Sequence, residues 1–269
     1  DKASSTTVVT FETGPYTYRG TAFTATAAVT GAGGLSAPVA VVYTGDCTNV
    51  TVANGCTATA TFAGDSNHTG SSDAKSITIT QASSTTVVTV SDAVYDGNPH
   101  GGTAVVTGVG GLNQAVPVKY VGRNTTIYPA SNTAPTAAGE YIAQARYPGD
   151  ANHTTSNDAK NFSITLAPSI TAVSCPTSVV YNGAAQTPCS ATVTGAGGLS
   201  LTPTPIYADN INAGTASASY SYAGDTNHSG SSDSKNFAIS LAPSITTVSC
   251  PASVVYNGAA QTPCSATVT

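Results

Sequence analysis

The strongest constraint on the fold of this chain is its internal repetition. Three short motifs recur in a fixed order along the 269 residues: Tyr-x-Gly, then Gly-Gly-Leu, then Gly-Asp-x-Asn-His followed by Asp-x-Lys. The Tyr-x-Gly copies begin at Tyr18, Tyr95, Tyr181 and Tyr256, at spacings of 77, 86 and 75 residues. The Gly-Gly-Leu copies begin at Gly33, Gly110 and Gly197, and the Gly-Asp-x-Asn-His copies at Gly64, Gly149 and Gly224. Self-similarity at a fixed period is the signature of a repeat architecture.

The motifs divide the chain into repeats at residues 3–80, 81–165 and 166–240, with a partial fourth repeat at 241–269. The fourth copies residues 166–194 with only two differences, Thr247 in place of Ala172 and Ala252 in place of Thr177. Its copy stops at Thr269, before the Gly-Gly-Leu motif.

Each repeat has the pattern of short strands. In the first repeat, four segments are rich in Thr, Val and Ala, namely residues 5–10, 24–29, 39–43 and 57–62. Several of these segments alternate between apolar and polar residues, as half-buried strands do. Gly, Pro, Asn and Asp lie between these runs and favour turns, and no stretch has a clear helical period. We therefore predict an all-β chain in which each complete repeat is a small antiparallel β-sandwich of about seven strands.

The joints between repeats are short. Residues 166–169 and 241–244 both read Leu-Ala-Pro-Ser, and Pro restricts its own backbone and that of the residue before it. Units connected in this way predict an elongated rod. The first joint, residues 80–83, lacks Pro, and we expect it to bend more.

The six cysteines fall into local pairs, and none has the C-x-x-C spacing of zinc or redox sites. This arrangement predicts three disulfides and an oxidising compartment. The predicted pairs are Cys47 with Cys56, Cys175 with Cys189, and Cys250 with Cys264. Because the second repeat has no cysteine, we expect the disulfide to be an accessory of the fold.

The charge pattern excludes some classes of partner. Net charge is −5, only 8% of residues are charged, and no basic run is present, so the footprint of a nucleic-acid-binding protein is missing. No apolar run approaches the roughly 20 residues of a transmembrane helix. We expect neither a nucleic-acid partner nor a membrane span in this segment.

Three segments of the second repeat resemble bacterial surface proteins. Residues 141–153, which end in Tyr-Pro-Gly-Asp-Ala-Asn-His, resemble the end of bacterial Ig-like repeats. The Tyr95-Asp96-Gly97 motif resembles the YDG or MBG repeats of large bacterial adhesins, and residues 134–141 fit the same pattern. The resemblance extends over essentially the whole chain, although the first and third repeats lack the Pro-Thr-x-Ala-Gly-x-Tyr segment. It implies tandem Ig-like sandwiches, a cell-surface or secreted location, and a spacer or adhesive role without catalytic residues.

The recurrent Gly-Asp-x-Asn-His loop is the main polar candidate site. One hypothesis is that its oxygens bind calcium, which takes six to eight oxygen ligands. The alternative is a structural turn closed by Asp and Asn. The small number of carboxylates in the loop favours the turn. The calcium candidates are Asp65, Asn67, Asp73, Asp150, Asn152, Asp158, Asp225, Asn227 and Asp233.

Histidines, lysines and N-x-Ser/Thr sequons provide three further kinds of candidate site. His68, His153 and His228 recur once per repeat, which favours a role in the fold over metal binding or catalysis. Lys75, Lys160 and Lys235 raise the idea of an isopeptide bond, but we expect them to be exposed. The N-x-Ser/Thr sequons, which are possible glycosylation sites, are Asn49, Asn67, Asn124, Asn152, Asn161 and Asn227.

These features lead to three hypotheses of function, none enzymatic and none with a cofactor. The first is the stalk or fibre segment of a bacterial surface or secreted protein. The second is a filament or sheath subunit, in which a neighbouring chain pairs with the partial fourth repeat. The third is an adhesin module that binds glycans or matrix through the loops of the repeats.

Overall fold

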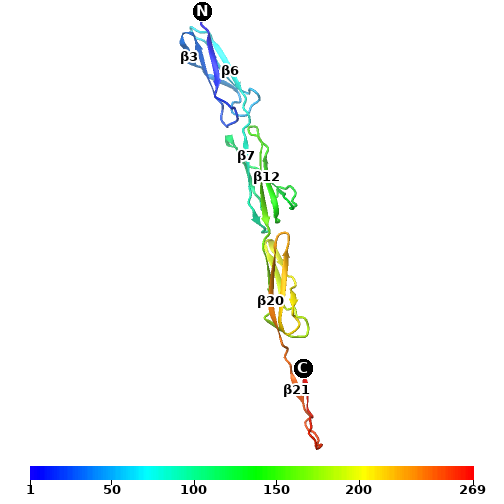
Figure 1. The fold of residues 1–269 in the computed structure, drawn as a ribbon. Helices are drawn as coiled ribbons and strands as arrows, with labels where there is room; N and C mark the ends of the chain where they lie inside the picture. The colour runs from blue at the N-terminus through cyan, green and yellow to red at the C-terminus, as the bar shows by residue number, and fades with distance from the viewer. The chain divides into compact units, whose positions relative to one another are not determined.

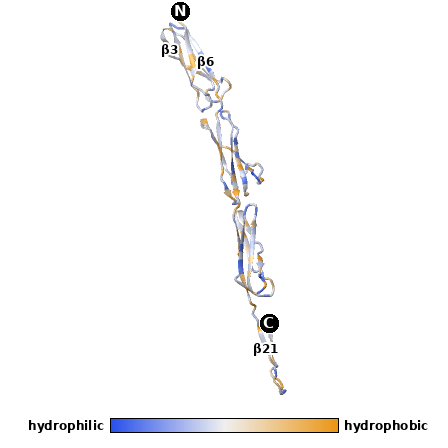
Figure 2. Cartoon of the chain, in the orientation of Figure 1, coloured by the Kyte–Doolittle hydropathy of each residue, from blue (hydrophilic) through white to orange (hydrophobic).

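A computed structural model describes all 269 residues, and its regular structure consists of 22 β-strands and three short 3₁₀ turns. The predicted all-β class is therefore confirmed (Figure 1). No helix has the length and apolar character needed to cross a membrane. Hydrophobic and hydrophilic residues are interspersed along the strands (Figure 2).

The chain divides into two compact units. The first contains Asp1–Val94 and Asn98–Thr165, and the second contains Tyr95–Gly97 and Leu166–Thr269. The first unit therefore holds nearly all of the first two predicted repeats, and the second unit takes in one Tyr-x-Gly motif from the chain before it.

The first repeat has two three-stranded sheets, in the orders β1-β2-β3 and β4-β5-β6. A 3₁₀ turn, η1 (Ala32–Gly34), lies on the Gly-Gly-Leu motif between β2 and β3. The strands are β1 (Ser5–Phe11), β2 (Ala25–Gly31), β3 (Leu35–Pro38), β4 (Val41–Gly45), β5 (Cys56–Phe62) and β6 (Ser71–Ile77).

The second repeat has a three-stranded sheet, β10-β9-β7, and a four-stranded sheet, β11-β12-β13-β8. Its 3₁₀ turn is η2 (Val109–Gly111). The strands are β7 (Ser84–Thr89), β8 (Ala93–Val94), β9 (Thr103–Gly108), β10 (Asn113–Ala115), β11 (Val118–Gly122), β12 (Gly139–Tyr147) and β13 (Ser156–Thr165).

The third repeat has the same plan, with sheets β14-β16-β17 and β15-β20-β19-β18 and the turn η3 (Ala196–Gly198). Its strands are β14 (Ser169–Ser174), β15 (Ser178–Val180), β16 (Ser190–Gly195), β17 (Leu199–Leu201), β18 (Ile206–Ala208), β19 (Gly214–Gly224) and β20 (Ser229–Ser240). The predicted count of about seven strands holds for the second and third repeats, whereas the first has six.

Residues 241–269 form one antiparallel pair, β21 (Thr246–Ser249) with β22 (Ser265–Val268). These strands correspond to β14 and β16 of the third repeat. Val248 is 62% exposed, whereas the corresponding Val173 is 3% exposed because it packs against Ala218 of the facing sheet. This pair therefore shows the apolar face that a facing sheet covers in the complete repeats.

Small side chains fill part of the space between the two sheets of the first repeat. In the first repeat, Val9 and Ala27 from one sheet pack against Ala58 and Ala60 from the other. Burying such alternating residues supplies the main favourable term for folding, and small residues keep the layers thin.

Side-chain hydrogen bonds tie the two sheets together at the same place in every repeat. The Asp73 carboxylate accepts a hydrogen bond from the buried backbone N–H of Val9 at 2.8 Å. The second and third repeats have the same bond, from Val88 to Asp158 and from Val173 to Asp233, each at 2.8 Å. Donors inside a protein need partners, so the aspartate of each Asp-x-Lys motif is a structural element of the sandwich.

One detail differs from the sequence-based expectation. The sheets are not wholly antiparallel, because β8 pairs with β13, and β15 with β20, in parallel.

Backbone hydrogen bonds hold both joints. At the first joint, Thr80 donates to the Tyr16 carbonyl at 2.9 Å, and Ala82 donates to the Asn152 carbonyl at 2.9 Å. At the second joint, Ala167 donates to the Asn227 carbonyl at 2.9 Å. The greater bending expected of the first joint stays a prediction.

Candidate functional site at the repeat junction

The Gly-Asp-x-Asn-His loop is a turn closed around one carboxylate. In the first repeat, Oδ1 of Asp65 accepts hydrogen bonds from the backbone N–H groups of Asn67 and His68, both at 2.7 Å. Nδ1 of His68 lies 3.0 Å from the same oxygen. The backbone bond from Asn67, with the bonds from His68, lowers the pKa of Asp65 below its ordinary value. The carboxylate is thus occupied by its own loop.

The histidine connects this loop to the Gly-Gly-Leu turn. His68 is buried, and its Nε2 lies 2.8 Å from the carbonyl oxygen of Ala32. Both ring nitrogens therefore face groups that only accept hydrogen bonds, and only the imidazolium form donates from both. The Ala32 carbonyl, followed by the Asp65 carboxylate, raises the pKa of His68 above 6.5.

The other two complete repeats have the same arrangement. His153 Nε2 lies 2.9 Å from the Val109 carbonyl, and His228 Nε2 lies 2.8 Å from the Ala196 carbonyl. Their Nδ1 atoms each lie 2.9 Å from an Asp oxygen, on Asp150 and Asp225 respectively. The third motif of each repeat is thereby joined to the second.

In the first unit, a Tyr-x-Gly motif packs on this cluster. The rings of Tyr18, in the first repeat, and His153, in the second, are 5.2 Å apart and nearly perpendicular, at 82°. Gly20 meets Gly110 so closely that a Cβ on Gly20 would lie 2.5 Å from the Gly110 Cα, and a Cβ on Gly110 would collide with the Tyr18 hydroxyl. Only glycine allows this approach of two backbones.

The second unit contains the same contact. Tyr95 and His228 have ring centroids 5.2 Å apart at 83°. A Cβ on Gly97 would lie 2.7 Å from the Gly197 Cα. All three sequence motifs thus converge, and the Tyr-x-Gly motif meets the histidine and the glycine turn of the repeat that follows it in sequence.

A second set of contacts fixes the junction in the first unit. Asn152, in the loop of the second repeat, accepts a hydrogen bond from the Val50 N–H at 3.0 Å and donates to Oδ1 of Asn49 at 3.0 Å. Asn49 and Val50 lie in the loop that the Cys47–Cys56 disulfide closes. In addition, Gln81 donates through Nε2 to the Asp150 carbonyl at 2.7 Å. The first two repeats therefore meet through rings, amides and backbone.

The calcium candidates are used for other contacts. Asp65, Asp150 and Asp225 close their own loops, whereas Asp73, Asp158 and Asp233 bond to the first strand of each sandwich. The backbone amides of Asn67, Asn152 and Asn227 are donors to the loop carboxylates. No group of three or more His, Cys, Asp or Glu side chains is arranged to hold a metal ion. The turn interpretation thus agrees with the geometry.

The lysines and sequons have distinct surroundings. Lys75, Lys160 and Lys235 are exposed on the last strand of each repeat. Asn49 and Asn152 contact each other, and the side chain of Asn124 bonds to Glu140. Asn67 and Asn161 are exposed, whereas Asn227 is half-buried. A glycan on Asn152 would be attached to Nδ2, the atom that donates to Asn49, and would therefore place a sugar within the junction.

The cysteines form three local disulfides, Cys47–Cys56, Cys175–Cys189 and Cys250–Cys264, and none is free. These are the pairs that the spacing predicts. Disulfides persist mainly in oxidising compartments, which agrees with a location outside the cytoplasm.

Sequence reasoning missed the partner of the Tyr-x-Gly motif, which we expected only to mark the start of each unit. The available signal was that this motif recurs with the same period as the histidine loop. No protein-family model matches the chain, and no curated protein matches it significantly. The geometry of the junction therefore carries the functional argument.

Proposed function

We propose that this chain is a non-enzymatic stalk or fibre segment of a bacterial cell-surface or secreted protein, built from Ig-like repeats in series. The observation that carries the proposal is the junction: a tyrosine and a glycine meet the histidine and the glycine turn of the following repeat. Contacts of this kind limit bending between neighbouring repeats, which is what a spacer requires. The disulfides and the resemblance to bacterial Ig-like repeats support a location outside the cell.

The most conspicuous polar residues also support a mechanical role. The loop aspartates and histidines bond to one another and to backbone groups, so they are not arranged as a nucleophile with its base. Their repetition follows from the repetition of the junction.

The proposal is tested by measuring the stiffness of the intact chain in solution. Small-angle X-ray scattering should show an elongated particle, and Gly110→Ala should shorten its maximum dimension because the added methyl group collides with Tyr18. Gly33→Ala is the matched control, since Gly33 has a similar positive φ (70° against 67°) but nothing within 4 Å of its Cβ position. Both variants carry the same backbone strain, and only one alters the junction.

Two results would contradict the proposal. One is a compact particle for the unmodified chain. The other is an unchanged maximum dimension in Gly110→Ala relative to Gly33→Ala, which would mean that the junction does not control the arrangement of the repeats.

A further inference from the structure

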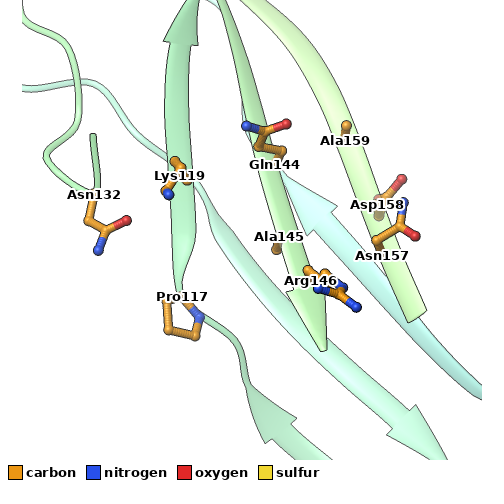
Figure 3. A pocket seen from close by; sticks show the side chains of 9 residues that line it. All are labelled: Pro117, Lys119, Asn132, Gln144, Ala145, Arg146, Asn157, Asp158 and Ala159. Atoms are coloured by element: carbon orange, nitrogen blue, oxygen red, sulfur yellow. The ribbon is translucent and has the colours of Figure 1, made fainter. Parts of the chain in front are cut away.

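The outer face of the four-stranded sheet in the second repeat carries a groove of about 490 Å³. Its floor is formed by β11, β12 and β13, and a loop that contains Asn132 borders it (Figure 3). The whole groove lies within the first unit. The polar side chains around it are Lys119, Asn132, Gln144, Arg146, Asn157 and Asp158.

The strand register places the important side chains next to one another. Lys119 on β11 pairs with Gln144 on β12, and Arg146 on β12 pairs with Asn157 on β13. Lys119 and Arg146 are diagonal neighbours on the outer face, a relation that corresponds to roughly 7–8 Å between backbone positions. The small side chain of Ala159, paired with Gln144, leaves the middle of the groove open.

The groove is positively charged in a chain whose net charge is −5. Lys119 and Arg146 are exposed and form no ion pair with a carboxylate of the chain. The acidic lining residue, Asp158, turns one oxygen towards the Val88 N–H at 2.8 Å and forms no ion pair with Lys119 or Arg146. Two cations and one carboxylate therefore line the groove beside three side-chain amides, which leaves one net positive charge.

The same positions in the other repeats show that the fold does not require these residues. The register aligns Lys119, Gln144, Arg146 and Asn157 with Val42, Thr59, Thr61 and Ser72 of the first repeat. It aligns them with Ile206, Ser219, Ser221 and Ser232 of the third repeat. The inward-facing residue that follows Asn157, and its counterparts in the other two repeats, is aspartate in all three. Because the repeats share this inward residue but differ in the outward ones, the outward residues of the second repeat point to a function of that surface.

We propose that this groove binds an anionic polysaccharide bearing carboxylate groups. The guanidinium of Arg146 and the ammonium of Lys119 pair with sugar carboxylates. The amides of Gln144, Asn132 and Asn157 both donate and accept hydrogen bonds, as sugar hydroxyls require. An open groove across three strands suits an extended polymer, and the site does not depend on the role of the chain as a stalk.

The test is an NMR titration of the intact, uniformly ¹⁵N-labelled chain with oligogalacturonate at low salt. We expect chemical-shift changes confined to β11, β12, β13 and the Asn132 loop. Lys119→Gln with Arg146→Gln should weaken binding roughly tenfold or more, because two charge-assisted contacts are lost. The control is Lys75→Gln with Lys235→Gln, which changes the net charge equally at exposed positions of the other two repeats and should leave binding unchanged.

A transfer experiment makes the test independent of the stability of the groove variant. Val42→Lys, Thr59→Gln, Thr61→Arg and Ser72→Asn together place the four strand side chains of the groove, without the Asn132 loop, on the first repeat, and should create a second, weaker set of shifting signals there. The proposal fails if oligogalacturonate causes no localised shifts in the unmodified chain. It also fails if both double variants weaken binding equally, if a neutral maltooligosaccharide of the same length binds as well, or if the transfer gives no new signals.

Discussion

The first and second repeats stabilise the same position of the sandwich in different ways. Cys56 pairs with Ile77 in the first repeat, and the corresponding Tyr141 pairs with Phe162 in the second. Cys56 is fully buried and forms a disulfide with Cys47. Tyr141 is 2% exposed and stacks on Phe162 with ring centroids 5.5 Å apart.

The third repeat resembles the first in this respect. Its corresponding residue is Ala216, which packs near the Cys175–Cys189 disulfide. At this position, the repeats with a small residue have a disulfide beside it, whereas the repeat without a disulfide has Tyr141 stacked on Phe162. Because domains of this size gain little from burial alone, we expect the disulfide and the stacked pair each to contribute measurably to the stability of its repeat.

The largest expected effect is that of breaking the stacked aromatic pair of the second repeat. Tyr141→Ala should destabilise the second repeat by about 3–5 kcal/mol, the usual cost of removing a large buried aromatic side chain. Hydrogen exchange followed by mass spectrometry would measure this as lost protection in β12 and β13. Ile127→Ala, at a position 95% exposed in the same repeat, should have no such effect. Undiminished protection in Tyr141→Ala would show that the stacked ring does not stabilise this core.

The second prediction concerns the disulfide of the third repeat. Replacing Cys175 and Cys189 together by Ala removes a link between residues 14 apart in sequence. A loop of about 15 residues contributes about 3 kcal/mol in the chain-entropy model. Hydrogen exchange should therefore show weaker protection of β14 and β16, while the second repeat keeps its protection. Equal loss of protection in the second repeat would mean that the repeats do not fold independently.

The third prediction tests a feature that the repeats share. Asp158→Ala leaves the buried N–H of Val88 without its acceptor, and an unsatisfied buried donor costs about 1–3 kcal/mol. Asp158→Asn keeps an oxygen at this place and should cost less. Protection of β7 would report the difference, and the corresponding Asp73 and Asp233 variants should behave alike. A repeat that tolerates Ala at this position would show that its sheets do not depend on this bond.

The alternation of Thr, Val and Ala was sufficient to predict the strands, and the cysteine spacing was sufficient to predict the disulfides. Both signals are local. The role of Asp73 was not predictable, because its partner, the Val9 N–H, lies 64 residues away in sequence. The short parallel pairs were missed for the same reason, since β8 and β13 are brought together only by the closed sandwich.

The junction could be predicted only in part. The order and the spacing of Tyr18, Gly110 and His153 can be read from the repeated motifs, but the contact between these residues cannot. The contact depends on the path of the chain at residues 80–83 and on a close approach of two glycine backbones. The groove was also beyond sequence reasoning, because Lys119 and Arg146 become neighbours only through the register of β11 and β12.

The smallest expected effect is a dependence on pH that differs between the first two loops. Tyr147 donates to Oδ2 of Asp150 at 2.6 Å and, with the loop amides, lowers the pKa of Asp150 to about 2. The first repeat has Phe62 at this position, opposite Ser71 as Tyr147 is opposite Ser156, so Asp65 lacks this donor. A carboxyl group with a lowered pKa stabilises the fold above its unfolded pKa, near 3.8, and loses this contribution as the pH falls through its folded pKa.

We therefore expect the loop of the second repeat to keep its hydrogen-exchange protection to a lower pH than the loop of the first. Tyr147→Phe should raise the pH at which protection is lost, and Phe62→Tyr should lower it in the first repeat. At higher pH, the histidines have the opposite effect, because the pKa values of His68 and His228 are raised in the folded protein. Their contributions to the stability of the fold are complete below pH 6.5 and are lost as the pH rises through the folded pKa. If exchanging Phe and Tyr leaves both acid limits where they are, the tyrosine hydroxyl does not determine the difference between the two loops.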